Sequence, residues 1–329
     1  MNNKIAIVSV KNELSGSCIA ISRLSKLLIE NNYDTKFYTS EGAVLSGYTK
    51  LQNTSLNIFK VIINIIKLNK NINKDSFIIF NTILSLPYYL LSFNHNKVLY
   101  IHEQNLKPNF LYKIINFLIN IFKVKVAVVN PIMLNKYNNS FLLQNYINIY
   151  IHEISIIKKK QILMISNCNF TKGIKDLFIL AKRYNKYKFV LLTNKDLAKD
   201  ECLEYLESIN IDNLIIYFDQ SLKSKLIEES KYLLSMSYYN ETFGLVLSEA
   251  IQNNTIPISI SNDGSNYCLN YNKSLIFTRS YVFNNFSSII NHIDKNHLVL
   301  LKTIKQYIGE EFNKHKIIFN LNKIMKEDT

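Results

Sequence analysis

The chain has 329 residues, of which 48% are hydrophobic and 19% charged, and its formal net charge is +14. This length predicts two domains of ordinary size, and the composition excludes a disordered chain. The basic excess suits an anionic lipid surface, a nucleic acid or a phosphorylated substrate, and residues 1–154 carry 16 basic against 7 acidic side chains. The basic side chains are scattered over both halves without a nucleic-acid-binding motif, so we expect no nucleic-acid partner.

The cysteines and the amino terminus indicate a cytoplasmic protein. The four cysteines lie far apart in the sequence and show no C-x-x-C spacing, which predicts free thiols rather than a metal cluster or a disulfide framework. They are Cys18, Cys168, Cys202 and Cys268. The apolar run at residues 5–10 is too short for the core of a signal peptide, so we expect a buried first strand there.

The first half of the chain alternates apolar strand-like runs with helical patterns. Strands are expected at residues 5–10, 35–39, 76–80, 97–101 and 124–129, and helices at 17–31, 56–68, 84–93 and 109–122. Continuous apolar strands that alternate with helices are typical of a parallel sheet covered on both faces. The first half therefore predicts an α/β domain.

The second half repeats this alternation after a polar stretch at residues 145–160, in which we place a domain boundary between residues 154 and 155. Strands are expected at residues 161–165, 188–193, 214–218, 232–236 and 255–260, and helices at 172–184, 198–209, 222–231 and 297–326. Open parallel sheets bind ligands beyond the carboxyl ends of their strands. We therefore expect a site in a cleft lined by those ends.

One segment, residues 238–250, combines the features of a ligand site. Its two carboxylates, Glu241 and Glu249, are separated by seven residues, and the pattern predicts a loop that leads into a helix carrying the second one. A helix N-terminus presents unpaired backbone N–H groups and a partial positive charge, which suit phosphate. Ionised carboxylates accept hydrogen bonds from sugar hydroxyls. The segment therefore predicts a site for a nucleotide sugar.

The second half resembles the retaining GT-B glycosyltransferases of family 4, which carry the glycosyl transferases group 1 domain. The resemblance runs through residues 162–165 with Lys172-Gly173, residues 188–194, residues 214–220, and residues 241–250 with Pro257-Ile258. The first half resembles the family more loosely, at residues 100–103 and 128–130. The resemblance implies two Rossmann-like domains with parallel sheets facing across a cleft. Residues 1–154 would bind the acceptor and residues 155–329 the nucleotide sugar, with the terminal helix packed back on the first domain.

The resemblance implies roles for residues around the donor. Glu241 would contact hydroxyls of the donor sugar, Glu249 would accept hydrogen bonds from the ribose, and Lys172 would stabilise charge on the leaving diphosphate. The residues expected to contribute through their backbone are Thr242, Phe243, Gly244 and Leu245. The family usually has an arginine where this chain has Asn167. An amide can hydrogen-bond a phosphate but brings no charge, so Asn167 keeps a non-catalytic role open.

Residues of the first half would complete the site. By the resemblance, His102 and Glu103 would lie near the reaction centre, Glu103 on the side of the acceptor. Gly16 and Ser17, in the first loop, would reach toward the donor phosphate and the acceptor. A lone histidine is more often structural, and for His102 that alternative stays open.

Residues 109–125 mix aromatic and basic side chains, and they allow two interpretations. The uncharged stretch at 114–122 is far shorter than the roughly 20 residues that span a bilayer. The helix either packs on the first sheet, which we slightly favour, or rests in an anionic membrane interface. The side chains concerned are Phe110, Tyr112, Phe117 and Phe122, with Lys113, Lys123 and Lys125.

The resemblance implies a metal-independent, hexosyl-type retaining glycosyltransferase that needs no cofactor. It would move a sugar from a nucleotide-diphosphate donor, with UDP favoured by family frequency. The acceptor would be an oligosaccharide or a lipid-linked glycan of a surface polysaccharide, such as lipopolysaccharide O-antigen or capsule, at the inner face of the membrane. The alternatives are a nucleotide-sugar epimerase or sugar phosphorylase of the same fold, and a non-catalytic protein that binds sugar nucleotides.

Overall fold

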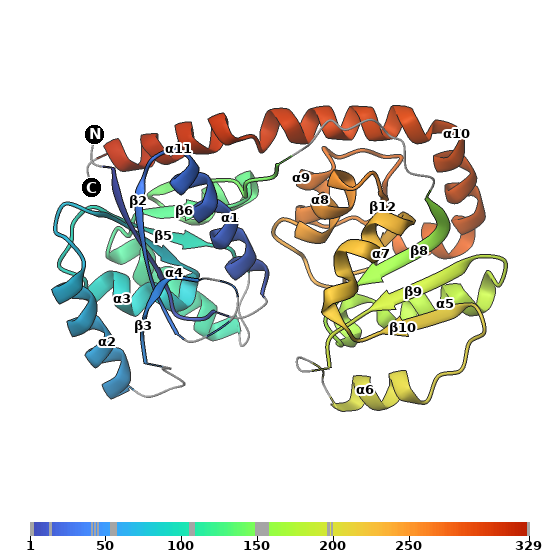
Figure 1. Ribbon diagram of the computed structural model, residues 1–329, viewed down its shortest axis with the longest axis horizontal. Coiled ribbons are helices and arrows are strands. Elements are labelled where there is room, and N and C mark those ends of the chain that lie inside the picture. The colour runs from blue at the N-terminus through green and yellow to red at the C-terminus, as the bar shows by residue number, and fades with distance from the viewer. Residues whose placement is uncertain are drawn as a thin grey trace. The chain divides into compact units, whose positions relative to one another are not determined.

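The chain folds into two compact units. The computed structural model describes residues 3–12, 15–40, 42, 44, 46–52, 58–104, 109–148, 158–195, 198 and 200–327. Unit 1 comprises Met1–Ile147 with Phe312–Thr329, and unit 2 comprises Asn148–Glu311 (Figure 1). The expected boundary between residues 154 and 155, and the expected helix start at residue 56, lie outside the described residues.

Unit 1 is built on a seven-stranded parallel sheet in the order β3-β2-β1-β4-β5-β6-β7. Its strands are β1 (Lys4–Ser9), β2 (Asp34–Thr39), β3 (Tyr48–Lys50), β4 (Phe77–Asn81), β5 (Lys97–Ile101), β6 (Val126–Val128) and β7 (Ser140–Leu142). Its α-helices are α1 (Gly16–Glu30), α2 (Ile58–Asn71), α3 (Leu86–Leu91), α4 (Asn109–Ile121) and α11 (Lys314–Lys326), and 3-10 turns span Ile83–Ser85 and Pro131–Lys136.

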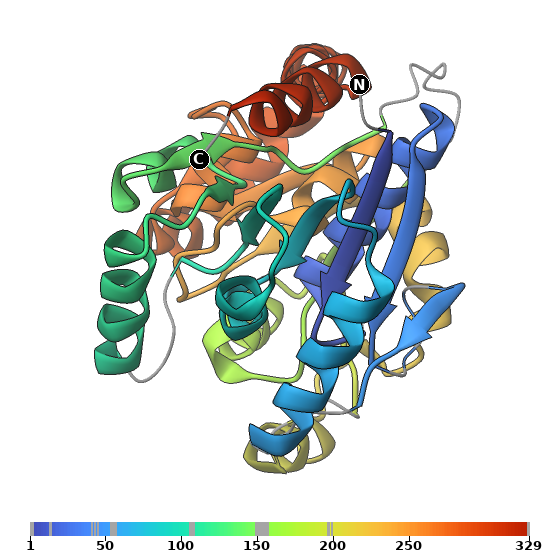
Figure 2. The ribbon, with the colours of Figure 1, turned by 90° about the vertical axis from the view of Figure 1, so that its left-hand side faces the viewer.

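The helices of unit 1 form layers on both faces of the sheet. The chain moves one way across the sheet from β1 to β2 and the opposite way from β3 through β6, and parallel crossovers are right-handed. Helix α1 therefore covers one face, and α2, α3 and α4 cover the other (Figures 1 and 2). Helix α11 is attached to unit 1 by the hydrogen bond from the Tyr33 hydroxyl to Asn322 Oδ1, 2.9 Å long.

Unit 2 is built on a six-stranded parallel sheet in the order β10-β9-β8-β11-β12-β13. Its strands are β8 (Lys159–Ile165), β9 (Lys188–Leu192), β10 (Leu214–Tyr217), β11 (Ser230–Ser235), β12 (Ile256–Ile260) and β13 (Ile276–Phe277). Its α-helices are α5 (Ile174–Arg183), α6 (Asp200–Glu207), α7 (Lys223–Glu229), α8 (Leu245–Gln252), α9 (Asp263–Cys268) and α10 (Arg279–Glu311), and 3-10 turns span Phe170–Lys172 and Gln220–Leu222.

The predicted fold class, α/β with two Rossmann-like parallel sheets, is confirmed, and three element boundaries are corrected. The final helical segment begins at Arg279 rather than at residue 297, because apolar side chains such as Val282 and Phe286 already form its buried face. The helix expected at residues 84–93 is a 3-10 turn followed by the short helix α3. Lys172 ends a 3-10 turn instead of starting a helix, because Gly173 adopts a left-handed conformation before α5.

Candidate functional site

In the second half of the chain, the residues expected at the donor lie in the segments that follow β8 and β11, next to a third segment that follows β12. Strands β8, β11 and β12 are neighbours and run parallel, so the segments that follow them meet beyond the same strand ends. The first segment holds Asn167 and Lys172, the second holds Glu241, and the third begins α9. The topology thus brings together residues that are far apart in the chain.

Close backbone contact fixes the turn that carries Lys172 against the loop after β11. Gly173 has φ +86°, and a Cβ atom at this position would lie 2.3 Å from the carbonyl oxygen of Met236. The backbone N–H of Tyr238 donates a 2.8 Å hydrogen bond to the carbonyl of Thr171. Only glycine meets both the conformation and the space.

In this arrangement Lys172 and Glu241 form an ion pair. The Nζ atom of Lys172 lies 2.8 Å from Glu241 Oε1, and both side chains are partly exposed. Exposed ion pairs contribute little to stability, about 0–1 kcal/mol, so the pair matters more for placement than for folding. The pair sets an ammonium group beside a carboxylate. The ammonium group can bind a phosphate, and the carboxylate can accept a hydrogen bond from a neighbouring sugar hydroxyl.

Helix α9 packs closely against the loop around Glu241. A Cβ atom on Gly264 would lie 2.7 Å from the backbone nitrogen of Phe243 and 2.8 Å from the carbonyl oxygen of Glu241. Asn240 donates to Asp263 Oδ2 at 2.6 Å, and the backbone N–H of Asp263 donates back to Asn240 Oδ1 at 2.7 Å. The sequence did not point to Gly264, because its role depends on these contacts with a distant part of the chain.

Helix α8 starts at the end of this loop, as the sequence predicted. Gly244 occupies the N-cap position with φ +78° and has no side chain that could cap the helix, and Leu245 is the first helical residue. The Phe243 side chain is buried against the ring of Tyr267, with centroids 6.3 Å apart. The first turn of α8 thus combines an uncapped helix N-terminus with a neighbouring ammonium group, an arrangement that favours an anion.

Glu249 lies in the second turn of α8 and pairs with a lysine that the sequence did not single out. Its Oε2 atom is 2.7 Å from Nζ of Lys223, the first residue of α7, and the two side chains are 10% and 28% exposed. The carboxylate is therefore compensated by an ammonium group from the neighbouring helix.

Asn167 belongs to the same loop as Lys172, and its side chain is exposed. The backbone carbonyl oxygen of Asn167 accepts a 3.1 Å hydrogen bond from the hydroxyl of Ser166. The turn that follows is capped by Asn169, whose Oδ1 accepts from the backbone N–H of Thr171 at 3.1 Å. The loop thus presents the amide of Asn167 at its surface, five residues before Lys172.

A cluster around the buried carboxylate of Asp176 packs against these loops. The Tyr238 hydroxyl donates a 3.0 Å hydrogen bond to Asp176 Oδ1, and the guanidinium of Arg279 lies 3.6 Å from the Tyr238 ring centroid. Arg279 also pairs with Asp176 and donates to the carbonyl of Met236 at 2.9 Å. The cluster connects α5 and α10 to the loop that leads to Glu241.

In unit 1, His102 lies at the carboxyl ends of three neighbouring strands. Its Nε2 atom is 3.0 Å from Asn81 Oδ1, and Asn81 Nδ2 donates to the hydroxyl of Ser9 at 3.1 Å. Burial lowers the pKa of His102 to about 3, so its imidazole is neutral at physiological pH. Because Asn81 Oδ1 is an acceptor, Nε2 carries the proton.

The other predicted residues of unit 1 are placed at the same strand ends. Oε2 of Glu103 accepts from the backbone N–H groups of Ile83 and His102, at 3.2 Å each, and burial raises the pKa of its carboxyl. Gly16 is exposed at the start of α1, and the Ser17 hydroxyl lies 3.3 Å from that of Ser15. These contacts show that Glu103 holds the turn after β4.

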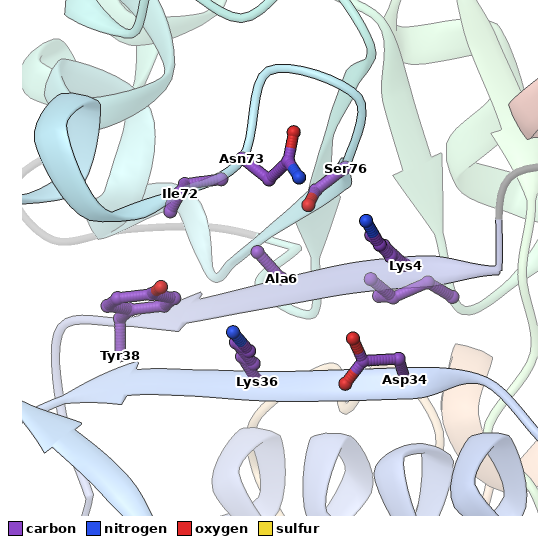
Figure 3. A pocket seen from close by; sticks show the side chains of 9 residues that line it. Lys4, Ala6, Asp34, Lys36, Tyr38, Ile72, Asn73 and Ser76 are labelled. Atoms are coloured by element: carbon purple, nitrogen blue, oxygen red, sulfur yellow. The ribbon is translucent and has the colours of Figure 1, made fainter.

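A cavity of about 150 Å³ lies elsewhere in unit 1, over the face of β1 and β2 (Figure 3). It is lined by residues such as Lys4, Asp34, Lys36 and Asn73, and none of the predicted site residues is among them. Lys4 and Asp34 are the first residues of their strands, whereas His102 follows the end of β5. The cavity is therefore separate from the candidate site.

Helix α4 exposes a stripe of aromatic and aliphatic side chains. Phe110, Ile114, Phe117 and Ile121 are exposed and recur at the spacing of one helix face, while Ile119 is buried. The slightly favoured interpretation, a helix packed on the sheet, accounts for Ile119 but not for this stripe.

Two further features are absent from the part of the chain that the structure describes. No helix there is long and apolar enough to cross a membrane. No group of three or more His, Cys, Asp and Glu side chains there could hold a metal ion.

Comparisons with known proteins bear on the family and on the fold. Residues 151–295 match the family described as Glycosyl transferases group 1. HepE from Anabaena, in complex with UDP and glucose, matches 98% of this chain and 99% of its own at a TM-score of 0.78 and 12% identity. Sucrose-phosphate synthase from Thermosynechococcus elongatus matches 98% of both chains at 0.74 and 15% identity. No curated protein sequence matches.

TarM from S. aureus, in complex with Fondaparinux, alpha-GlcNAc-glycerol and UDP, is 22% identical over 80% of this chain, with a TM-score of 0.65. This chain covers 58% of that TarM chain. The family match thus lies in the second half of the chain, and the whole chain has the two-domain α/β fold of the GT-B glycosyltransferases.

Proposed function

We propose that this protein is a retaining glycosyltransferase that moves a sugar from a nucleotide-diphosphate donor, a UDP-sugar, to a glycan. The observation that carries the proposal is the Lys172–Glu241 pair, 2.8 Å apart beside the start of α8 and inside the segment that matches the group 1 domain. The UDP present in the HepE and TarM structures supports UDP as the nucleotide.

In the proposed reaction, the acceptor hydroxyl attacks the anomeric carbon on the face from which the diphosphate leaves. The bond between that carbon and the acceptor oxygen forms, the bond to the phosphate oxygen breaks, and the proton of the hydroxyl passes to the leaving diphosphate. Lys172 and the N-terminus of α8 stabilise the negative charge that develops on the diphosphate, so no metal ion is required. Glu241 orients the sugar and Glu249 the ribose, through hydrogen bonds from their hydroxyls.

The residues of unit 1 serve the acceptor in this proposal. His102 is neutral with its Nε2 proton directed at Asn81, so it acts as a polar positioning group rather than as a cationic acid. Ser17, in the first turn of α1, and Gly16 before it would approach the donor phosphate and the acceptor through their backbone. Glu103 acts on the acceptor side through the turn that it holds.

A lipid-linked acceptor at an anionic membrane surface, as in O-antigen or capsule assembly, follows from the same reasoning about unit 1. The exposed stripe of α4 and the neighbouring Lys113 and Lys123 provide apolar and basic side chains for an interface location. Liposome sedimentation with and without anionic lipid tests this location. Equal binding to neutral and anionic vesicles, or no binding to either, contradicts it.

The site assignment is tested with Lys172→Ala and Glu241→Ala in assays of donor hydrolysis and sugar transfer. We expect a loss of at least about a hundredfold in kcat/KM for each, comparable to the removal of one group that stabilises developing charge. Lys159→Ala and Glu229→Ala are matched controls, because these residues form a 2.6 Å ion pair at the start of β8, away from the site. Near wild-type turnover in both site variants contradicts the assignment.

Asn167 favours a second candidate, a protein that binds sugar nucleotides without transferring them. A thermal-shift panel of UDP-, GDP- and dTDP-sugars identifies the donor first, since a bound ligand stabilises the fold by mass action. Tight donor binding with no transfer to any acceptor would favour this candidate. Conversion of the donor alone, without an acceptor, would instead indicate an epimerase.

A further inference from the structure

A second helix of unit 1 exposes an apolar stripe like that of α4. Phe59, Ile62, Ile63 and Ile66 of α2 are all exposed and recur at the i, i+3, i+4, i+7 spacing of one helix face. The opposite side of α2, which includes Leu68, is buried. The exposed stripe is therefore additional to the face that packs on the core.

The segment after α3 extends this stripe. Asn69 of α2 donates to the carbonyl of Leu91 at 3.2 Å and accepts from the backbone N–H of Phe93 at 3.1 Å. The Phe93 side chain is 83% exposed. Helices α2, α3 and α4 belong to the same layer over the sheet (Figure 2). We call the exposed side chains of this layer the two-helix face: Phe59, Ile62, Ile63, Ile66, Leu91, Phe93, Phe110, Ile114, Phe117 and Ile121.

The charge around the two-helix face selects its partner. Neither α2 nor α4 contains an acidic residue, and Lys60, Lys70 and Lys113 are exposed on them. The acid nearest in sequence is Asp75, in the loop after α2. Aromatic and aliphatic side chains flanked by lysines match an anionic lipid interface, whereas a second copy of this face would oppose lysine to lysine.

We propose that α2 and Phe93 join α4 in one docking face for an anionic lipid bilayer. This inference rests on the proposed membrane location and extends it from one helix to two. Two stripes on separate helices fix the orientation of unit 1 on the surface, whereas a single stripe would leave rotation about its own axis. The carboxyl ends of the strands then keep a constant relation to the membrane plane, as a lipid-linked acceptor requires.

Vesicle sedimentation of the full chain with phosphatidylcholine–phosphatidylglycerol vesicles tests the inference. We expect the paired substitution Ile62→Ser and Ile66→Ser to lower the partition coefficient about tenfold, as expected for two partly buried aliphatic side chains. The pair Ile114→Ser and Phe117→Ser should do the same on α4. Phe319→Ser is the matched control, since this side chain is 69% exposed on α11, outside the face.

The outcomes separate the two proposals. If the α2 variant binds vesicles like the wild type while the α4 variant does not, this inference is overturned and the membrane location stands. If the wild type does not bind anionic vesicles, both are overturned. Self-association of the wild type in sedimentation velocity, abolished in the α2 variant, would assign the face to a second copy of the chain and also overturn the inference.

Lys223, the lysine beside Glu249, is the basis of a second inference. Lys223 Nζ lies 2.7 Å from Glu249 Oε2, and the Glu249 side chain is only 10% exposed. A carboxylate that is nearly buried needs a compensating charge to stay fixed and ionised. We infer that Lys223 is a positioning residue that holds Glu249 ready for the ribose hydroxyls, which rests on the proposed binding of a nucleotide donor.

Binding of UDP and of 2′,3′-dideoxyuridine diphosphate to the full chain tests this role. We expect Lys223→Met to weaken UDP about tenfold, the order of one hydrogen bond to a charged group, and to leave the dideoxy analogue within about twofold. Lys223→Arg should restore most of the affinity for UDP. Lys225→Met, at an exposed position of the same helix, is the control.

Equal losses for both nucleotides, or no loss for UDP, overturn the role of Lys223 and leave the proposed function intact. Failure of the wild type to bind any nucleoside diphosphate removes the proposed function and this inference together. Thermal unfolding of the unliganded Lys223→Met variant separates a binding effect from a folding defect, since the inference predicts only a small shift.

Discussion

Gly264 provides the sharpest test of how the donor loop is built. Its backbone conformation is not restricted to glycine, so Gly264→Ala acts only through the added methyl group. That group would lie 2.7 Å from the backbone nitrogen of Phe243 and 2.8 Å from the carbonyl oxygen of Glu241. Both neighbours are main-chain atoms, so the loop itself must move by several tenths of an ångström.

The expected magnitude follows from this contact. Overpacking against a fixed neighbour costs about 1–3 kcal/mol, which lowers the melting temperature of a unit of this size by roughly 2–10 °C. Glu241 moves with the loop, away from its place beside Lys172. Because small misplacements of a binding group reduce rates steeply, we expect about a tenfold loss in kcat/KM for the donor.

Gly309→Ala is the matched control for this substitution. A Cβ atom on Gly309 meets nothing within 4 Å, and the residue lies in helix α10. Alanine should therefore raise stability by about 0.5–1 kcal/mol and leave donor binding unchanged. Thermal unfolding and donor kinetics of both variants are the measurements. Wild-type stability and kinetics in Gly264→Ala would refute the close approach of α9 to the loop.

Three further predictions concern charge. The pKa of His102, about 3, lies below its ordinary value of 6.5, so between these pH values the unfolded chain binds a proton that the folded chain does not. The free energy of unfolding should therefore fall as the pH drops below about 6.5, by up to about 1.4 kcal/mol per pH unit. His102→Gln should flatten this pH dependence in urea unfolding. Asn167→Arg should tighten UDP binding several-fold in calorimetry, whereas Asn167→Gln should not. Arg279→Met leaves the buried carboxylate of Asp176 without its charged partner and should cost about 3 kcal/mol in urea unfolding.

Most strands could be predicted from the sequence, because a strand buried on both faces is a continuous apolar run. Strands β1, β4, β5, β8 and β11 all fall at their predicted places. Strands β3, β7 and β13 could not be found, since they are two or three residues long at or near sheet edges and lack such a run. Their pairing depends on the neighbouring strand rather than on their own residues.

The residues of the candidate site also fall into two groups, those that the sequence indicated and those that it did not. Glu241, Gly244 and Glu249 were accessible because their pattern is local: a loop, a glycine and the first turns of a helix. Gly264 and Lys223 were not, because their importance comes from contacts across the fold, with the backbone of Glu241 and with the Glu249 carboxylate. In sequence they read as a turn glycine and a lysine at a helix start. For α4, the sequence shows which side chains are apolar but not which face the sheet covers.

The charges at the candidate donor site bear on the role of Asn167. Lys172 is paired with Glu241, and Lys223 with Glu249, so these four side chains together contribute no net charge. In the proposed function, a diphosphate would therefore be compensated by the N-terminus of α8 and by Lys172, which also pairs with Glu241. An arginine at position 167 would add one positive charge to this neutral set and would therefore favour binding of the anion. On this view, the amide at this position adjusts how tightly the diphosphate is held, while the groups that orient the sugar and the ribose stay in place.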